Sequence, residues 1–403
     1  MSVKKINVVV FLVLLFLLCS GTALAQAQRN WWHTLERGKQ MFRQGDFGNA
    51  LLVFEDARRQ RKAMYDRMER DFIDLLSLYE VRRMGDSLDW VERFIQERRY
   101  IGAAAALEEL YYRIPRSSFD NSVSIALAAL QTLGEYPEAE FWIGEIYLVE
   151  GEFTLALNQF QKAYELRSLL ENPGFTTELL HRIADIHRIR QDFNEMEQAL
   201  LSIIEADSLW TGGIPENYSR PEGAAAQSRG IFVRQAMTRT LENNGIDRFL
   251  TLYRYNNNAS VNAHRLLGYY YYTNGRHARA QEHLMFAFLI QNTIIIEELM
   301  RTPLLQSTNL RSTDSENLHF TFTTLENLAV EINRNRRLGE FTENIEYYKT
   351  AYYLGSSLYA NGRIAPAMEL WNFLAAQDRA GEWQIRAIGQ LRSPHIEQLV
   401  EIR

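Results

Sequence analysis

The chain has 403 residues, a formal net charge of -6 and a hydrophobic fraction of 46%. This composition is typical of a globular protein, and it gives no reason to expect nucleic acid as a partner, because nucleic-acid-binding faces usually show net or clustered positive charge. Prolines number only eight and strand-like alternation is scarce, so we expect an all-α protein.

Residues 1–25 have the pattern of a secretory signal peptide. Lys4 and Lys5 precede an apolar run at 8–18, and small residues follow it up to Ala25. This order predicts that the segment is removed on export. An exported chain without a disulfide framework indicates a bacterial envelope, so the predicted location is periplasmic or secreted.

The single cysteine, Cys19, lies inside this segment, so the mature chain would contain no thiol. The alternative interpretation is a lipoprotein anchored at Cys19. Against it stands the bulky Leu18, because a lipoprotein signal has a small residue there. The apolar run is short for a membrane span, and no transmembrane span is expected in the mature chain.

After the signal, the spacing of apolar residues predicts helices along almost the whole chain. In chain order the helical segments lie at 31–64, 58–83, 86–97, 100–112, 119–133, 137–170, 177–207, 230–255, 261–294, 320–337, 348–381 and, as a last helix, near 394–402. The segments 31–64, 137–170, 261–294 and 348–381 are each expected to hold two helices joined by a turn. Residues 58–83 either extend the second helix of the first pair or form an extra helix. Residues 300–316 are polar and are expected to be an exposed loop.

The glycines and prolines of residues 208–228 interrupt the helical pattern. The favoured interpretation is a linker between N-terminal repeats at 26–207 and C-terminal repeats at 229–403. The alternative is an ordered loop that fills a groove.

Residues 137–170 predict a helical hairpin most clearly. Ile143, Gly144 and Tyr147 share one face of a first helix, and Gly151 ends that helix. The second helix carries its stripe at Phe153, Ala156, Leu157, Phe160, Ala163 and Tyr164. The small residues on both stripes allow the two helices to pack closely.

The same spacing recurs in three further segments of about 34 residues. The residues that match Gly144, Gly151, Ala156 and Phe160 are Gly38, Gly45, Ala50 and Phe54, then Gly268, Gly275, Ala280 and Leu284, then Gly355, Gly362, Ala367 and Trp371. Weaker copies lie at 84–117 and 177–210. Such a recurrence predicts a stack of similar helical hairpins.

This motif resembles the tetratricopeptide repeat family, in an exported bacterial form. The sequence departs from the family at the first-helix tryptophan, which is replaced by Thr34, Glu140, His264 and Ala351, and the closing proline is missing from all four copies. The resemblance implies an all-α fold, an α-solenoid of helical hairpins, and no particular chemistry.

A search for catalytic and metal-binding motifs finds none that is convincing. The eight histidines include no pair four residues apart with an intervening glutamate, and no glycine-rich phosphate loop with lysine appears. Neighbouring carboxylates such as Glu297 and Glu298 diverge on a helix, so they are not arranged for glycan cleavage. We therefore expect no enzyme, no metal and no cofactor.

The resemblance implies a concave face lined by the first helix of each pair. The groove residues that it implies are Lys39, Phe42, Phe141, Glu145, His181, Asp185, Arg188, Arg265, Tyr269, Tyr272, Tyr352, Ser356 and Tyr359, with Leu35 and Leu148 beside them. This aromatic-rich set suits a peptide or a partner helix. Lys39 stands where the family's carboxylate clamp has asparagine, which argues against capture of a C-terminal carboxylate. The alternative is that the tyrosines at 269–272 and 352–353 partly pack between helices.

The expected function is a non-enzymatic adaptor that docks another envelope protein or a peptide segment of it. The settings considered are outer-membrane biogenesis, cell-wall enzyme regulation and a periplasmic flagellar structure. The alternative is a small-molecule or lipid-binding subunit of a transport system, with an enclosed apolar cavity near residues 208–228.

Overall fold

The computed structural model describes residues 31–78, 93, 128, 131–205, 226–301 and 324–397. These residues form helices and turns without any strand, so the all-α prediction is confirmed for this part of the chain. The chain divides between Gln191 and Asp192 into two compact units. The predicted signal peptide at 1–25 and most of the predicted linker at 208–228 lie outside the described residues, as does Cys19.

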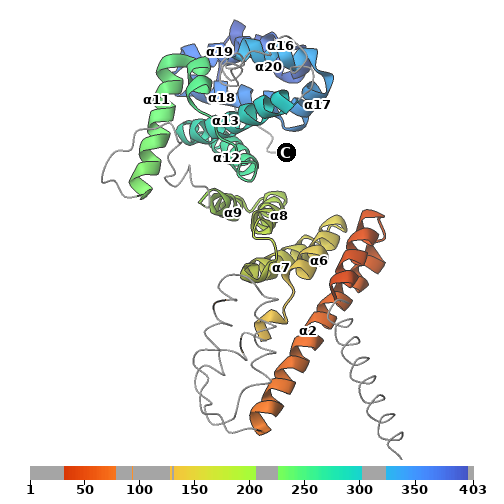
Figure 1. Ribbon diagram of the computed structural model, residues 1–403. Helices are drawn as coiled ribbons and strands as arrows, with labels where there is room; N and C mark the ends of the chain where they lie inside the picture. Colours follow the sequence, from red (N-terminus) through yellow and green to blue (C-terminus); the bar gives the residue numbers. More distant parts are fainter. Residues whose placement is uncertain are drawn as a thin grey trace, which may run out of the picture. The chain divides into compact units, whose positions relative to one another are not determined.

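The first unit comprises, over its described residues, helical residues 31–43, α2 (Phe47–Leu78), α6 (Pro137–Val149), α7 (Phe153–Glu165), the 3-10 turn η1 (Arg167–Leu169) and α8 (Phe175–Ile189), as drawn in Figure 1. Helix α2 packs against α6, α6 against α7, and α7 against α8. Helix α2 continues unbroken through residues 58–78, so this charged stretch extends the second helix of the first pair and is not an extra helix.

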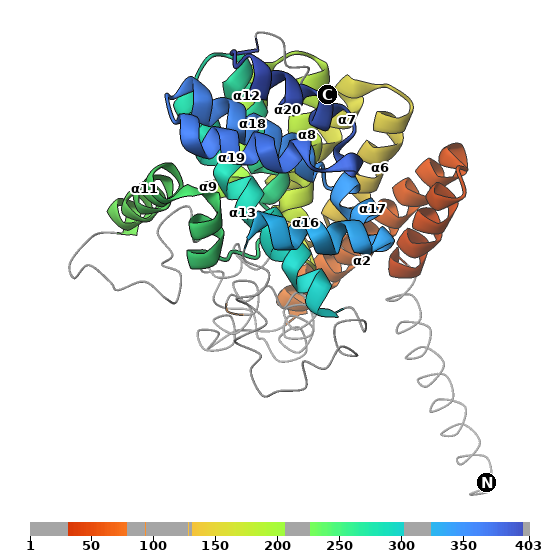
Figure 2. The same cartoon turned by 90° about the horizontal axis from the view of Figure 1, so that it is seen from above.

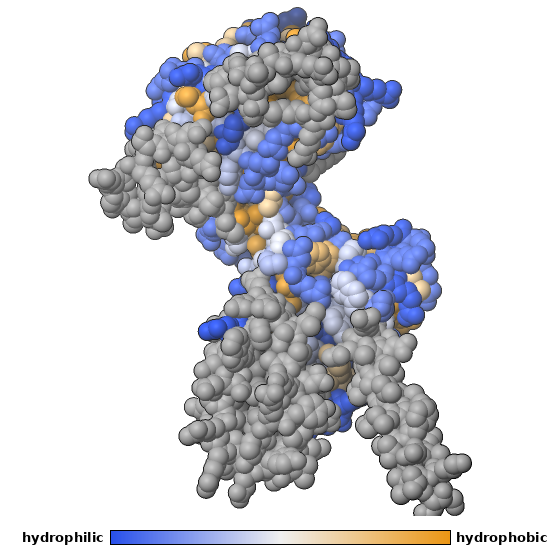
Figure 3. Space-filling model, in the orientation of Figure 1, coloured by the Kyte–Doolittle hydropathy of each residue, from blue (hydrophilic) through white to orange (hydrophobic). Residues whose placement is uncertain are grey.

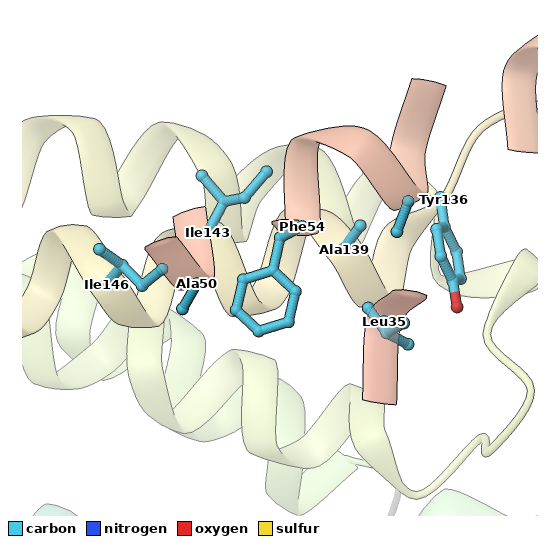
Figure 4. Packing of buried hydrophobic residues seen from close by; sticks show 8 residues of the cluster. Leu35, Ala50, Phe54, Tyr136, Ala139, Ile143 and Ile146 are labelled. Carbon is cyan, nitrogen blue, oxygen red and sulfur yellow. The ribbon is translucent and has the colours of Figure 1, made fainter. Parts of the chain in front are cut away.

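The core of the first unit lies where residues 31–43, α2 and α6 meet (Figure 4). Its buried members are Leu35, Ala50, Phe54, Ala57, Tyr136, Ala139, Ile143 and Ile146. The ring of Phe54 also stacks on Trp142, with 6.0 Å between ring centroids. Burial of one such large side chain stabilises a fold by about 1.5–3 kcal/mol, so this core joins the first helical pair firmly to α6.

Each of the four predicted hairpins is closed by a glycine on its first helix against a large side chain on its second. A Cβ built at the glycine would lie 2.5 Å from Phe54 for Gly38, 2.8 Å from Phe160 for Gly144, 2.5 Å from Leu284 for Gly268 and 3.0 Å from Trp371 for Gly355. Real Cβ atoms essentially never come closer than 3.0 Å, so the first three contacts leave no room for a Cβ, and the contact at Gly355 is tighter than nine in ten real Cβ contacts. The recurring glycine is therefore required by close helix packing, as the sequence predicts.

The turn between the two helices of each hairpin is also repeated. Gly45, Gly151, Gly275 and Gly362 have φ of 81°, 79°, 69° and 77°. In each turn the next residue donates its N–H to a carbonyl five residues earlier, for example Glu152 to Tyr147 at 2.8 Å. Only glycine adopts this left-handed backbone without a steric cost. Gln191 occupies the corresponding position after α8, at φ 62°.

The second unit comprises, over its described residues, α9 (Phe193–Glu205), α11 (Ala226–Leu252), α12 (Val261–Thr273), α13 (His277–Arg301), α16 (Leu325–Arg334), α17 (Arg336–Asn344), α18 (Tyr347–Ala360), α19 (Ile364–Ala375), the 3-10 turn η2 (Asp378–Ala380) and α20 (Glu382–Arg392). Helix α12 pairs with α13 and α18 with α19, and α13 packs on α18. Figure 2 shows α18, α19 and α20 lying together in this unit.

Helix α12 is covered on several sides, because α9, α13 and α18 all pack against it. Its four consecutive tyrosines are consequently all buried, with 1 to 7% of their surface exposed. Tyr270 stacks on Phe193 of α9, at 5.9 Å between ring centroids, and the Tyr271 hydroxyl donates to Glu197 of α9 at 2.6 Å. The packing alternative for residues 269–272 is thus what the structure of this unit shows.

The predicted last helix near 394–402 is wrong for its described residues. Residues 394–397 are not helical, and the last described helix, α20, ends earlier at Arg392. Ser393 has φ -150° and ψ 82°, which lies outside the α region. A residue that precedes proline is sterically pushed out of the α region, so Pro394 stops the helix instead of starting one.

On the face drawn in Figure 3, the described residues are mainly hydrophilic, and hydrophobic residues show as small separate patches. The most exposed large hydrophobic side chains include Leu52, Ile364 and Ile385, at 60, 58 and 72%. Scattered exposure of this kind is normal for globular proteins. Among the described helices, none combines the length and the apolar character that crossing a membrane requires.

Candidate functional site

The predicted groove residues of the first helical pair lie beside an aromatic side chain of α6. Lys39 is half-buried, and its Nζ lies 5.8 Å from the centroid of the Trp142 ring and 5.4 Å from that of Trp32. Phe42 meets the edge of Trp142 at 5.4 Å between centroids. A cation near aromatic faces is attracted by their negative quadrupole, so these side chains form one partly exposed cluster.

Phe141 and Glu145 of α6 are buried within the first unit. Phe141 packs between Phe160 and Phe175, with ring centroids 5.5 and 4.4 Å away. The Glu145 carboxylate accepts a hydrogen bond from Arg182 Nε at 2.5 Å. Burial raises the pKa of Glu145, and Arg182 opposes that effect. Phe141 therefore packs α6 against α7 and α8, and Glu145 links α6 to α8.

The three predicted residues of α8 are half-buried on the same helix as Arg182. Asp185 and Arg188 form an ion pair, with 3.5 Å between Oδ1 and Nη2. His181 is half-buried near them on the helix. Glu145 of α6 therefore lies close to Arg182 and Asp185 of α8. The negative charge of Asp185 also raises the pKa of Glu145.

In the second unit, the predicted tyrosines of α12 and α18 meet around one ring that belongs to Tyr353. The ring centroid of Tyr353 lies 5.3 Å from that of Tyr269, 5.4 Å from Tyr272 and 5.4 Å from Tyr352. The ring of Trp383 on α20 adds a further contact at 5.6 Å from Tyr353. We call this cluster of four tyrosines and Trp383, together with Tyr359 of α18, the tyrosine face.

Hydrogen bonds orient the hydroxyls of the tyrosine face. The Tyr269 hydroxyl lies 3.2 Å from Thr350 Oγ1. The Tyr352 hydroxyl accepts from Gln390 Nε2 at 3.2 Å, and the Tyr353 hydroxyl accepts from Arg386 Nη1 at 3.2 Å. These bonds join α18 to α12 and to α20.

Ser356 is buried on the same helix, and its hydroxyl donates to the Tyr352 carbonyl at 3.0 Å. Arg265 forms an ion pair with Glu346, just before α18 begins, and Lys349 lies 3.8 Å from the same carboxylate. Both contacts are internal to the unit. The ion pair of Arg265 with Glu346 holds the start of α18 against α12.

Residues 393–397, which are not helical, lie against the tyrosine face and Gln390 of α20. The Tyr359 hydroxyl donates to the Pro394 carbonyl at 3.3 Å, and the His395 N–H donates to Gln390 Oε1 at 2.9 Å. The Tyr352 hydroxyl donates to Glu397 Oε1 at 2.6 Å. Tyrosines that were predicted to line a groove are thus in contact with polypeptide of the same chain.

The Glu397 carboxylate is the charged group of this contact. Its Oε2 lies 3.6 Å from Arg386 Nη1. Burial raises the pKa of Tyr272 to about 12, and the negative charge of Glu397 adds to this effect. The pKa of Tyr352 is raised by burial first and then by its hydrogen bond to Glu397. Both hydroxyls therefore stay protonated at neutral pH, and that of Tyr352 donates to Glu397.

Sequence reasoning missed the contribution of α20 to this site. Trp383, Arg386 and Gln390 all contact the tyrosine face. Their spacing of three and four residues places them on one side of a helix, so a stripe was present in the sequence. A mixed stripe of tryptophan, arginine and glutamine has no apolar periodicity, which explains why it gave no helix prediction.

A second cluster of titratable side chains is fully buried between α12 and α13. Nδ1 of His264 lies 3.1 Å from Nδ1 of His283. Burial lowers the pKa of both imidazoles, that of His283 to about 3. His264 stands where the repeat motif has tryptophan, so a polar pair replaces an apolar contact there. Among the described residues, no group of three or more His, Cys, Asp or Glu is arranged to hold a metal ion.

No family model matches the chain. The chain is 24% identical over 239 residues to an uncharacterized protein of Treponema pallidum. The aligned region covers 59% of this chain and 60% of that protein. It is also 21% identical over 271 residues to an uncharacterized protein of Borreliella burgdorferi, and this aligned region covers 64% of this chain and 78% of that protein. The chain is thus distantly similar to two spirochete proteins, and it spans about 60% of the length of the Treponema protein.

Proposed function

We propose that this chain is a non-catalytic scaffold that binds another protein of the bacterial envelope through the first helices of its repeated hairpins. The observation that carries the proposal is the tyrosine face, because it already holds a non-helical stretch of polypeptide, residues 393–397. Tyr359 and Gln390 bond to the backbone of that stretch, at the Pro394 carbonyl and the His395 N–H. Main-chain bonds with side-chain contacts are a general mode of peptide recognition.

The repeat architecture supports the same function. Four hairpins share the glycine-to-large-residue contact and the left-handed turn glycine, as tetratricopeptide repeats would. We propose that the hairpins are members of that family and stack as an α-solenoid. Solenoids present an extended concave surface along one set of helices, and such surfaces bind peptides and partner helices.

The signal pattern at residues 1–25 supports export, and with it a periplasmic or secreted location. The partner is then another envelope protein or a peptide segment of one. Three settings suit an exported scaffold: outer-membrane biogenesis, cell-wall enzyme regulation and periplasmic flagellar machinery.

Site-specific photo-crosslinking in the native envelope tests the proposal. A photoreactive phenylalanine analogue is placed at Lys39 or Tyr359, two partly exposed groove positions, and captured proteins are identified by mass spectrometry. The controls carry the analogue at Leu52 or Ile364, exposed positions on second helices. We expect one protein to be captured from the groove positions and not from the controls. An empty capture, or the same capture at all four positions, contradicts the proposal.

A further inference from the structure

The segment 393–397 contacts the tyrosine face mainly through polar atoms. Two of its contacts use the backbone, at Pro394 and His395, and the third uses the Glu397 carboxylate. Four of the five residues are exposed, and Ile396 keeps 46% of its surface in contact with solvent. Little apolar surface is therefore buried under the segment, and the hydrophobic effect adds little to holding it in place.

We infer that residues 393–397 are a displaceable occupant of the tyrosine face, and that a partner segment carrying a glutamate takes their place. This inference rests on the proposed function and identifies the kind of peptide that the face selects. The bond from Tyr359 to the Pro394 carbonyl is exposed and the other two are part-buried, and a peptide that offers a carbonyl, an N–H and a carboxylate in the same order can replace the three contacts one for one.

The chemistry of the face defines the partner segment. Tyr359 donates to one backbone carbonyl, and Gln390 accepts from the next backbone N–H, so these two contacts require only these two backbone groups and no particular side chain. Specificity comes from the carboxylate, three residues after the bonded carbonyl. It accepts from the Tyr352 hydroxyl at 2.6 Å and lies beside the Arg386 guanidinium. A glutamine cannot replace it without losing the charged contact.

The face is preformed for such a partner. When Glu397 leaves, Tyr352 keeps its bond from Gln390 and Tyr353 keeps its bond from Arg386. Packing of the tyrosine rings against Trp383 does not depend on the segment. A site whose side chains are already oriented loses little conformational entropy on binding.

A fluorescein-labelled peptide with the sequence of residues 391–398 tests the inference by fluorescence anisotropy. It is titrated into the mature full chain, into the E397A and E397Q variants, and into E326A, which alters an exposed glutamate of α16. We expect E397A and E397Q to bind the peptide at least tenfold more tightly than the wild-type chain, because their own segment competes less. E326A should match the wild type, and circular dichroism of all four should agree.

The second arm tests the specificity for a carboxylate. A peptide with glutamine at the position of Glu397 should bind E397Q at least tenfold more weakly than the parent peptide. Equal binding of the parent peptide by the wild type and both variants overturns the inference, and so does equal binding of the two peptides. Self-association of the wild type that E397A abolishes also overturns it, because the face would then hold the segment of a second copy.

These readouts separate this inference from the proposed function. If one envelope protein is captured from the groove positions while the wild type, E397A and E397Q bind the peptide equally, only the inference that residues 393–397 are displaceable is overturned. Tighter peptide binding by E397A together with an empty capture in cells overturns only the scaffold proposal.

Discussion

Gly144 of α6 lies directly under the ring of Phe160 of α7, so that a Cβ at position 144 would come within 2.8 Å of Phe160 Cε1. The G144A variant is therefore expected to lower the free energy of unfolding by about 1–3 kcal/mol through overpacking. Urea denaturation of the mature chain measures this. Gly48 provides the control, because it is exposed in α2 with open space around it. G48A should be neutral or stabilise the chain by up to about 1 kcal/mol. Equal changes in the free energy of unfolding for G144A and G48A would contradict the close packing of Gly144 against Phe160.

The turn positions predict opposite effects for two substitutions. Gly151 has φ 79°, so G151A should cost about 1–2 kcal/mol of stability, because a Cβ is strained in the left-handed region. Gln191 already bears that strain at φ 62°, and Q191G should relieve it. Thermal unfolding of both variants checks the sign. A Q191G variant that melts at a lower temperature than the wild type would show that the Gln191 side chain contributes more to stability than its left-handed backbone costs.

Glu140 is fully buried, and removing its cationic partners is expected to cost more stability than neutralising its carboxylate. It accepts from Arg58 Nη1 at 3.1 Å and from Lys162 Nζ at 2.6 Å, while both cations remain partly exposed. The R58M/K162M double variant leaves a buried carboxylate without its cations and should cost about 3–5 kcal/mol. E140Q leaves cations that water can solvate, so its cost should be smaller. Chemical denaturation that ranks E140Q as the more damaging change would contradict this account.

The buried pair of His264 and His283 predicts loss of stability in acid. Their pKa values in the folded chain are lowered below 6.5, so the unfolded chain binds more protons than the folded one below that pH. The stability that the neutral pair supports is therefore fully present above pH 6.5 and is lost as the pH falls toward about 3. Arg234 and Arg279 face the pair and act in the same direction.

Urea denaturation at pH 7 and pH 5 measures this dependence. The H264L/H283L variant should lose less stability between the two pH values than the wild type. His395 is exposed, so H395Q serves as the control and should keep the wild-type dependence. An unchanged pH dependence in H264L/H283L would show that other groups cause it.

Tyr269 and Tyr359 should differ in their contributions to stability. Tyr269 is 1% exposed, and truncation of a fully buried aromatic side chain costs about 3–5 kcal/mol. Tyr359 is half-buried, so Y359A should cost much less and mainly loosen the contact with Pro394. Melting temperatures report the first effect, and hydrogen exchange at residues 393–397 reports the second. Similar melting temperatures for the two variants would place Tyr269 outside the packed interior.

The hairpins could be predicted from the sequence because their determinants are local. Gly144 and Phe160 lie on the two helices of one hairpin, and the tight turn at Gly151 between these helices brings them together. The same offsets predict the turn at Gly275, with its positive φ. His264 was visible as a polar residue within a predicted helix, but its partner was not, because His283 lies on another helix.

The candidate site was predicted only in part. The spacing placed Tyr272, Tyr352 and Tyr359 on the first helices, but it did not show what would cover them. Whether a helical position is open or buried depends on which elements pack beside it, and those elements are distant in sequence. Helix α20 and residues 393–397 cover α18, and α9 covers α12.

The sequence by itself therefore determined the all-α class and the repeated hairpin, since both follow from residues within one helical turn or one tight turn of each other. Only the tertiary structure decided that the tyrosines of α12 are all buried and that Glu397 lies against Tyr352. Those contacts join helices far apart along the chain, and local spacing carries no information about which distant surfaces are buried together.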